Sequence, residues 1–342
     1  MKVLQSKESE KRVIFHSYDR KILALLCKNV RLPLAKIAQL LRLSRQSVEY
    51  RLKVMEKAHV LEGSRALVNI SALGYNSYHY FFALQDEDKE QILKERALKS
   101  EMVNALITYS GRYTHELSII ARSPAEAHRH FLFLIEGLNV LTPTPVVLLS
   151  TIKAEVLPEL QREKLSTIKN LRNDPSFSKQ FSLPLQKYVL DTKDLELLYL
   201  LSQNARLSLI ELGKKTLLSS DAVSYRIKKL IRANYILEFR PVINFDALSY
   251  SLQAVLIRAR RSKAEDELFR QYLREDISIL WATELFGDWD YLLYVLNHSQ
   301  EEIHASVKGM KKAFPNFFVS YELLFAFQEH KYSFMTEAMM KA

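Results

Sequence analysis

Two segments of the sequence carry similar hydrogen-bonding and charged side chains at the same spacing. SRQSVEYRLKVM runs from Ser44 to Met55, and SSDAVSYRIKKL runs from Ser219 to Leu230. Each begins with serine, a good N-cap, and continues with tyrosine, arginine and lysine at matching places. Arginine and lysine bind phosphate oxygens, and glutamine, arginine and tyrosine can also contact bases. The chemistry available in these two segments is recognition of a polyanion.

A helical projection divides each segment into a buried stripe and an exposed face. At about 100° per residue, Val48, Leu52 and Met55 share one side of the first helix. The candidate DNA contacts on the remaining surface are Arg45, Gln46, Tyr50, Arg51, Lys53 and Lys57, and, in the second helix, Ser220, Asp221, Tyr225, Arg226, Lys228 and Arg232. Arg51 and Arg226 lie at the border of the buried stripe, where a phosphate contact and a structural ion pair are equally favoured.

The two candidate helices differ at their N-terminal ends. Arg45-Gln46 of the first corresponds to Ser220-Asp221 of the second, while the tyrosine and the basic residues are kept. Because phosphate contacts set position and base contacts set sequence, both helices are expected to dock. The carboxylate of Asp221 must either accept a hydrogen bond from a cytosine amino group or be repelled by the backbone of DNA. The second helix is therefore expected to read different bases, or few.

Positive charge is concentrated around these two segments. The chain of 342 residues has 49 lysines and arginines against 39 acidic residues, a formal net charge of +10. Residues 18–65 hold 11 basic and 4 acidic side chains and residues 193–240 hold 9 and 5, which gives +7 and +4 and leaves −1 for the rest. This distribution indicates a polyanionic partner, although an ordinary basic surface is the alternative.

Both segments belong to a longer internal repeat. Residues 19–75 align without gaps on 194–250, an offset of 175, with roughly a third of the positions identical. Each copy predicts three short helices, at residues 18–29, from 33, and 45–57, and at 193–203, 208–215 and after Ser219. A short β pattern follows, with Arg65 or Arg240 near its tip as a candidate DNA contact. These features predict a winged helix-turn-helix in each copy.

The remainder of each copy predicts the order β-α-β-β-α-β. The expected strands are 78–84, 105–109, 117–121 and 145–152, then 252–258, 279–285, 291–296 and 319–327; the expected helices are 89–99, 124–138, 264–274 and 301–314. The fold class is α+β, two copies of a winged helix-turn-helix plus a ferredoxin-like βαββαβ sandwich. The expected domains are an N-terminal tail 1–17, winged helix-turn-helix modules 18–75 and 192–250, ferredoxin-like effector or pairing domains 76–157 and 251–334, a linker with a helix 158–191, and a C-terminal tail 335–342.

This architecture resembles the Lrp/AsnC family of transcription regulators. The residues that carry the likeness are Asp19 with Ile22-Leu23, Asp194 with Leu197-Leu198, Asn29-x-Arg31, Asn204-x-Arg206, the segments SVEYRLKVM and AVSYRIKKL, and Gly287-Asp288-Trp289-Asp290-Tyr291-Leu292-Leu293. The resemblance implies binding of double-stranded DNA by the third helix in the major groove, and a sandwich that mediates pairing. Typical members carry one copy and assemble as dimers or higher, so this chain is expected to form an intramolecular pseudo-dimer and a homo-oligomer.

The resemblance also implies a small-molecule effector such as an amino acid. Its candidate residues are Gly287, Asp288 and Asp290, at the turn between the two central strands of the second sandwich. A tight turn, with glycine for positive φ and aspartate for turn hydrogen bonds, is the alternative. The corresponding Gly111-Arg112-Tyr113-Thr114 of the first copy lacks both aspartates.

An enzyme is the main functional alternative, because siroheme decarboxylases share the two-module architecture and can occur as fused copies. Arg112, Tyr113, His115 and Arg122 lie near one turn of the first copy, whereas Asp288 and Asp290 make the equivalent turn acidic. A winged-helix protein-interaction module is a further alternative. His128 and His130, two residues apart on a helix, point to different faces, so no metal site is expected, and no catalytic residue or cofactor is predicted.

The setting expected from the sequence is the cytoplasm. Cys27 is the only cysteine, which excludes an intrachain disulfide and fits a reducing compartment. No signal-peptide pattern and no apolar run of membrane-spanning length is found, so no membrane partner is predicted.

Overall fold

The computed structural model describes residues 15–160, 188–260 and 262–341, and these fall into two compact units. One unit combines the two winged helix-turn-helix modules, and the other combines the two sandwiches. Like domains of the two copies therefore associate, rather than the two domains of each copy. Most of the expected N-terminal tail 1–17 and of the linker 158–191 lies outside the described residues.

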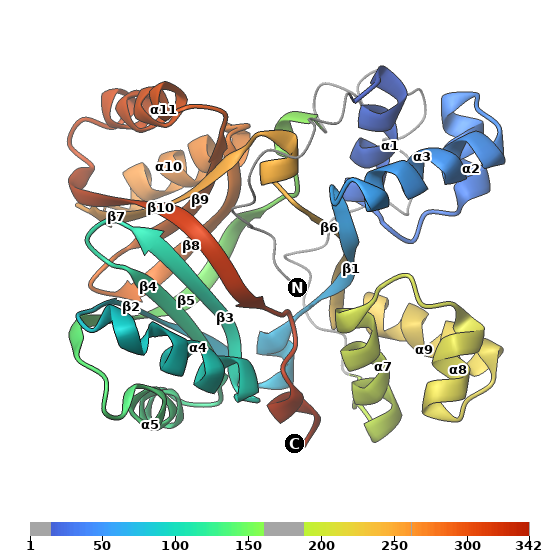
Figure 1. The fold of residues 1–342 in the computed structure, drawn as a ribbon, viewed down its shortest axis with the longest axis horizontal. Coiled ribbons are helices and arrows are strands. Elements are labelled where there is room, and N and C mark those ends of the chain that lie inside the picture. Colours follow the sequence, from blue (N-terminus) through green and yellow to red (C-terminus); the bar gives the residue numbers. More distant parts are fainter. Residues whose placement is uncertain (1–14, 161–187, 261, 342) are drawn as a thin grey trace. The chain divides into compact units, whose positions relative to one another are not determined.

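The winged helix-turn-helix unit has the expected helices in both copies (Figure 1). The first copy forms α1 (Ser17–Lys28), α2 (Leu34–Leu41) and α3 (Arg45–Lys57), and the second forms α7 (Thr192–Gln203), α8 (Leu209–Thr216) and α9 (Ser220–Arg232). The hydroxyl groups of Ser44 and Ser219 accept hydrogen bonds from backbone N–H groups in the first turns of α3 and α9. After these helices, His59 and Asn234 adopt φ of 53° and 57°.

The wing strands pair with each other instead of forming two separate wings. β1 (Leu61–Val68) and β6 (Ile236–Ile243) form an antiparallel two-stranded sheet in which Arg65 lies opposite Arg240. These residues are equivalent in the repeat, so a pseudo-two-fold axis passes between them. Two backbone bonds obey the same symmetry: Val30 donates to Phe239 (3.0 Å), and Ala205 donates to Ser64 (3.1 Å).

The sandwich unit contains the expected four strands and two helices of each copy. The first copy forms β2 (Asn76–Leu84), α4 (Glu90–Lys99), β3 (Val103–Ser110), β4 (His115–Ala121), α5 (Pro124–Ile135) and β5 (Val140–Ala154). The second forms β7 (Ser251–Ala259), α10 (Lys263–Glu275), β8 (Ile279–Gly287), β9 (Tyr291–Asn297), α11 (Gln300–Ala313) and β10 (Phe318–Tyr332). Short 3₁₀ helices complete the described chain: η1 (Ile70–Leu73), η2 (Glu87–Lys89), η4 (Asp246–Leu248) and η5 (Glu337–Met340).

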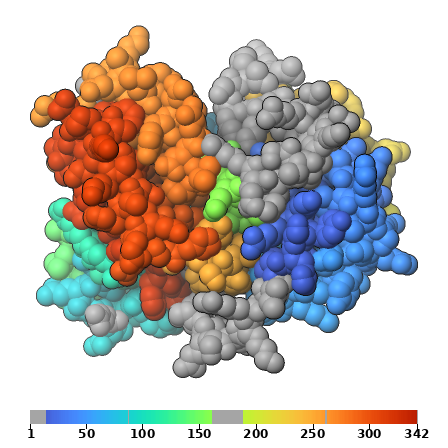
Figure 2. All heavy atoms as spheres, turned by 90° about the horizontal axis from the view of Figure 1, so that it is seen from above, coloured from blue at the N-terminus to red at the C-terminus, as the bar shows by residue number. Residues whose placement is uncertain are grey.

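The two sheets close into one barrel with the strand order β10-β3-β4-β2-β5-β8-β9-β7. Pairing of β5 with β8 and of β10 with β3 joins the copies, and β10 also pairs with β7. Each copy keeps an apolar core between its sheet and its helices, and a third core fills the barrel interior. The outer surface of the second sandwich is drawn in orange and red in Figure 2.

The C-terminal residues 335–342, expected to be a tail, are instead packed as far as they are described. Met335 and Met339 are buried, and η5 lies against α7 within the winged helix-turn-helix unit. Tyr199 of α7 donates a hydrogen bond to Glu337 of η5 (3.1 Å). Sequence reading missed this contact because two apolar residues near a chain end form too short a pattern to predict packing.

Candidate nucleic-acid interface

The third helix of each winged module packs as the sequence predicted. Val48, Leu52 and Met55 are the buried residues of α3, and Val223, Ile227 and Leu230 are those of α9. These apolar stripes face the preceding helices, α2 and α8, with which α3 and α9 make their main helix contacts. Packing therefore directs the opposite face of each third helix toward solvent.

The exposed faces contain most of the predicted DNA contacts. The side chains of Tyr50 and Tyr225 are 70% and 60% exposed, unusually high values for aromatic residues. The other exposed candidates are Arg45, Gln46, Lys53 and Lys57 on α3 and Asp221, Lys228 and Arg232 on α9, while Ser220 is half-buried. Each helix thus presents a tyrosine and basic groups on one accessible side.

Arg51 and Arg226 make structural ion pairs. A terminal nitrogen of Arg51 lies 2.7 Å from Asp19 of α1, and one of Arg226 lies 2.7 Å from Asp191 and 2.8 Å from Asp194. Hydrogen bonds to Asp194 and Asp191 raise the pKa of Arg226. These arginines tie each third helix to the first helix of its own module, which favours the structural role over a phosphate contact.

Arg65 and Arg240 are not at exposed wing tips. They are 9% and 4% exposed, in the centre of the β1–β6 ribbon, and Arg240 is paired with Glu238 (2.7 Å). Their burial contradicts the expectation that they project toward phosphates or a minor groove. The sequence showed the strands but not that the strands of the two copies would pair.

Reciprocal arginine contacts hold the two winged modules together. Arg31 donates to the carbonyl groups of Ala205 and Leu207 in the second module, the latter at 3.1 Å. Its equivalent, Arg206, donates through Nε to the carbonyl of Val30 in the first module (3.0 Å). Since the guanidinium groups are planar and fixed at both ends of the interface, α3 and α9 are held in one mutual geometry.

The turns that precede the third helices contain exposed residues that sequence reading missed. Arg42, in the left-handed conformation (φ 55°), is exposed, and its equivalent in the second module is Leu217 (φ 57°), which is 85% exposed. Conversely, Lys214 and Lys215 are exposed on α8, where the first module has Gln39 and Leu40. Arg42 and Leu217 lie just before the N-cap serines Ser44 and Ser219, and this position in the sequence could have identified them as candidate contacts.

Tyr225 also has an intramolecular contact. The ammonium group of Lys229 lies 4.8 Å from the ring centroid of Tyr225 and 5.1 Å from that of Tyr188. The equivalent of Lys229 in α3 is Val54, so no such cation–π contact can form around Tyr50 from that position. If Tyr225 binds a ligand, it must give up or share its contact with Lys229. Tyr50 has no equivalent lysine contact to give up, because Val54 occupies that position.

The turn proposed as an effector site has structural reasons for its residues. Oδ2 of Asp290 accepts from the backbone N–H of Ala259 (2.8 Å), and the carbonyl of Asp288 accepts from Nε of Arg258 (2.8 Å). Gly287 has a φ of +141°, and a Cβ there would come within 2.7 Å of the carbonyl oxygen of Pro145. These contacts support the tight-turn interpretation, and effector binding there stays a prediction.

The four residues that suggested an enzyme, Arg112, Tyr113, His115 and Arg122, do not surround a common site. Tyr113 is buried in the barrel interior, where its hydroxyl lies 3.1 Å from that of Thr144. His115 points the other way and stacks on Phe82 (5.4 Å). Arg112 is exposed and paired with Glu322 (3.0 Å), and Arg122 is exposed. Neighbours in sequence are thus distributed over different faces of the sheet.

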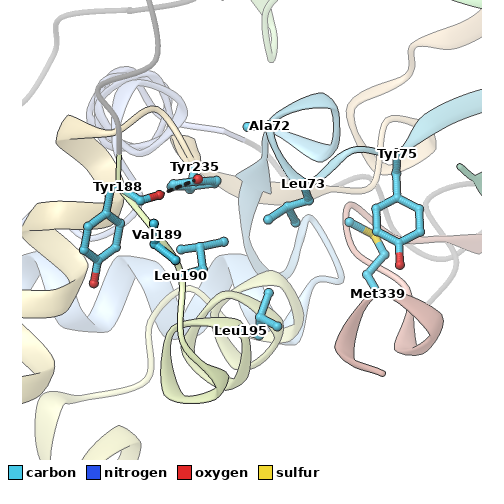
Figure 3. A pocket seen from close by; sticks show the side chains of 9 residues that line it. All are labelled: Ala72, Leu73, Tyr75, Tyr188, Val189, Leu190, Leu195, Tyr235 and Met339. Atoms are coloured by element: carbon cyan, nitrogen blue, oxygen red, sulfur yellow. Dashed lines mark hydrogen bonds between the residues drawn. The ribbon is translucent and has the colours of Figure 1, made fainter. Parts of the chain in front are cut away.

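An open pocket of about 320 Å³ lies within the winged helix-turn-helix unit (Figure 3). Its lining is mostly apolar: Ala72, Leu73, Tyr75, Tyr188, Val189, Leu190, Leu195, Tyr235 and Met339. The hydroxyl of Tyr235 donates to the carbonyl of Tyr188 (2.9 Å), and that of Tyr188 donates to Asp194 (2.8 Å). Burial raises the pKa of Tyr188 to about 12. The hydroxyl groups of Tyr188 and Tyr235 are therefore already committed within the protein.

Membrane-spanning helices and metal-binding clusters are not found in the part of the chain that the structure describes. Over residues 15–160, 188–260 and 262–341, no helix is long and apolar enough to cross a lipid bilayer. The same described residues contain no group of three or more histidine, cysteine, aspartate or glutamate side chains arranged to hold a metal ion.

The fold and the two exposed third helices define a DNA-binding protein with paired winged helix-turn-helix modules. A family model described as a winged helix-turn-helix for DNA binding matches residues 16–62 and 190–236. The proline dehydrogenase transcriptional activator of Rhizobium radiobacter is 34% identical over 109 residues, which cover 31% of this chain and 69% of that protein. The regulator LrpB of Bacillus subtilis is 28% identical over 150 residues, 44% of this chain and 97% of LrpB. The chain belongs to the Lrp/AsnC family and is a tandem DNA-binding regulator.

A solved structure extends the likeness to the tandem arrangement. The siroheme decarboxylase NirDL matches 95% of this chain and 96% of its own, with a TM-score of 0.59 and 12% sequence identity. At this identity the match shows a shared fold only.

A further sequence relative is the regulatory protein AsnC of Haemophilus influenzae. It is 25% identical over 134 residues, which cover 39% of this chain and 89% of AsnC.

Proposed function

We propose that this protein is a sequence-specific regulator that binds double-stranded DNA as a fused pseudo-dimer, with α3 and α9 entering the major groove. The observation that carries the proposal is the exposed tyrosine and basic face on each third helix, held in a pseudo-symmetric pair by Arg31 and Arg206. Two recognition helices related by a two-fold axis match half-sites that are themselves related by symmetry.

The two half-sites are expected to be unequal. In the first module Arg45, Gln46 and Arg42 are exposed around the N-terminus of α3, and all three can donate to bases or phosphates. The equivalent residues of the second module are Ser220, Asp221 and Leu217, which include an acid and an exposed apolar side chain. The second module retains lysines elsewhere, so it contributes backbone affinity with altered or weaker base reading.

Selection of bound sequences from random double-stranded DNA tests this proposal directly. We expect a site with one well-defined half and one degenerate half, and an affinity that falls as salt concentration rises. The matched pair of variants is Tyr50→Ala with Lys53→Ala against Tyr225→Ala with Lys228→Ala, titrated against the selected site. Absence of salt-dependent binding even at low ionic strength would refute DNA binding, and a fully symmetric site would refute unequal reading.

Modulation by an effector and further homo-oligomerisation remain parts of the proposal. The predicted effector residues Gly287, Asp288 and Asp290 form a turn in which Asp288 and Asp290 also accept hydrogen bonds from the protein itself. Titration of each amino acid into the protein–DNA complex, followed by a change in affinity, would identify an effector.

A tetrapyrrole enzyme is the second candidate, because the fold of NirDL extends over nearly the whole chain. The dispersed placement of Arg112, Tyr113 and His115 argues against it. A tetrapyrrole absorption band on the purified protein, or a shift in the absorption band of an added iron-porphyrin with carboxylate substituents, would favour the enzyme.

A further inference from the structure

A cluster of polar side chains is enclosed in the barrel interior, among otherwise apolar residues. The interior cluster consists of Ser77, His79, Tyr109, Glu116 and Ser118 from the first copy and Tyr294 from the second. Glu116 is completely buried, and burying a carboxylate is costly unless it is fully hydrogen-bonded. All of these residues belong to the sandwich unit, and none is part of a third helix.

Glu116 is the centre of the interior cluster. Its Oε1 lies 2.5 Å from Nδ1 of His79, and its Oε2 accepts from the hydroxyl of Tyr109 (2.5 Å). The hydroxyl of Tyr294 lies 2.8 and 2.9 Å from the two carboxylate oxygens. On the far side of the imidazole, Nε2 of His79 lies 3.0 Å from Ser77 and 3.1 Å from Ser118. The second copy thus supplies one hydroxyl donor to a carboxylate of the first.

The interior cluster is not repeated in the second copy. At the equivalent positions, Ala254 replaces His79, Leu285 replaces Tyr109 and Leu292 replaces Glu116. Ser118 corresponds to Tyr294, so the donor and the acceptor of the inter-copy bond are on different copies. The two faces that meet in the barrel therefore differ in chemistry: one presents a buried acceptor, and the other presents its donor on an apolar background.

One pair of contacts between the sandwiches, made by two equivalent lysines, is symmetric and cannot distinguish the copies. Nζ of Lys331, on β10 of the second copy, donates to the carbonyl groups of Ala97 (3.0 Å) and Ser100 (2.7 Å) at the end of α4. Its equivalent, Lys153 on β5, donates to the carbonyl of Asp276 at the end of α10. Two identical copies could make either contact equally well.

We propose that the Glu116–Tyr294 contact makes the two sandwiches pair only with each other, the first copy with the second and not like with like. If two first copies paired, Ser118 would occupy the position of Tyr294. Its shorter side chain would leave a cavity, and the carboxylate of Glu116 would lose one hydrogen-bond donor. If two second copies paired, Tyr294 would face Leu292, and its buried hydroxyl would lack this acceptor.

This choice of partner has a consequence for assembly. Two modules that each paired with their own kind would require a second chain, and would either close as a two-chain dimer or link chain to chain into larger species. Unlike pairing closes the barrel, and inside one chain it also has the advantage of a high effective concentration. The interior cluster adds chemical selectivity to that advantage, as complementary and mismatched groups do in other specific interfaces.

The first test is a double-mutant cycle in the full chain, with Glu116→Leu and Tyr294→Phe, measured by urea unfolding. We expect the two changes to be coupled by at least about tenfold in the folding equilibrium constant, or 1.4 kcal/mol. The control is Tyr291→Phe, three residues earlier on β9, whose hydroxyl donates to Asp266 of its own copy (2.9 Å). Its effect should add to that of Glu116→Leu without coupling.

The second test measures directly whether the two sandwiches of one chain pair with each other or with those of other chains. Wild type, Glu116→Leu and the milder Glu116→Gln are unfolded and refolded over a series of protein concentrations, and the mass distribution is measured by light scattering. Wild type should return to one distribution throughout, whereas Glu116→Leu should give a growing fraction of larger species, with Glu116→Gln between them. Lack of coupling in the cycle, or identical distributions for all three chains, would overturn the proposal.

Discussion

The first and second winged modules share a framework but differ at the surface that would meet DNA. Both use an aspartate in the first helix to hold an arginine of the third, and both send an arginine across the interface to backbone carbonyl groups. Around the N-terminus of the third helix, however, Arg42, Arg45 and Gln46 correspond to Leu217, Ser220 and Asp221. The pairing contacts are thus kept in both copies, while the exposed side chains around the third helix differ.

The two sandwiches also share a framework, but they differ on the buried faces by which they contact each other. Their outer framework is similar, with lysines 153 and 331 at equivalent positions, but the buried faces that meet in the barrel differ at Glu116 and Leu292. In the winged unit the copies diverge where they face solvent, and in the sandwich unit they diverge where they face each other. Duplication thus allowed two kinds of asymmetry, one directed at a ligand and one at the partner copy.

The largest expected difference between the winged modules concerns their buried aspartates. Asp194 is 1% exposed in its side chain and accepts from Arg226, Tyr188 and the Asp191 N–H, whereas Asp19 is 13% exposed. Asp194→Ala should lower the free energy of unfolding by about 3–5 kcal/mol, because it leaves a partly buried arginine without this carboxylate. Asp19→Ala should cost about 1–2 kcal/mol. Urea unfolding followed by circular dichroism measures both, and equal losses would contradict the comparison.

DNA affinity should separate the modules next. Tyr50→Ala with Lys53→Ala is expected to weaken binding to the selected site by about a hundredfold, near 2.7 kcal/mol, because in the proposed binding mode the first module supplies both positioning and base contacts. Tyr225→Ala with Lys228→Ala should weaken it by about tenfold. Fluorescence anisotropy at fixed salt measures the two losses, and a larger loss from the second pair would reverse the assignment.

Acid stability should depend on a histidine that only the first copy has. Burial, followed by the nearby His330, lowers the pKa of His115 from 6.5 to about 4, and Tyr291 is the equivalent residue of the second copy. Because the folded state binds this proton more weakly than the unfolded state, His115 removes stability as the pH falls from about 6.5 to about 4.

His115→Gln should therefore flatten the decline of unfolding free energy over this pH range. Glu90 and His330 also face His115, at 4.0 Å for Glu90 Oε1. An unchanged slope in His115→Gln would show that this histidine is not the cause.

A smaller effect is expected from giving the second module a base-reading side chain. Asp221→Gln removes the charge opposed to the DNA backbone and restores the residue type of Gln46. Affinity should rise by about three- to tenfold, and the degenerate half of the selected site should become more defined. The reciprocal Gln46→Asp should weaken binding, and equal insensitivity of both positions would exclude them from base reading.

The smallest effect concerns the turn after each winged module. Gly74 has φ +78° with open space where a Cβ would lie, and its equivalent Ser249 has φ 61°. Since a side chain at positive φ is strained, Ser249→Gly should stabilise the protein and Gly74→Ala should destabilise it, each by about 0.5–1 kcal/mol. Thermal unfolding measures the shifts, and a loss of stability in Ser249→Gly would show that another contact of this serine dominates.

The sequence by itself determined the repeat, the order of the elements and the exposed faces of the third helices. Helical periodicity placed Val48, Leu52 and Met55 inside and Tyr50 and Lys53 outside, because these positions depend on residues three and four apart. The boundaries of α3 were predicted to the residue, since Ser44 marks its N-cap.

Only the tertiary structure decided how the two copies meet. Arg65 and Arg240 lie in the ribbon centre, Arg51 and Arg226 pair with carboxylates about 32 residues away, and Glu116 is buried beside a tyrosine 178 residues later. Such contacts join residues remote in sequence, so no local periodicity encodes them. A polar residue in an apolar strand becomes interpretable when its partner is known, and here that partner belongs to the other copy.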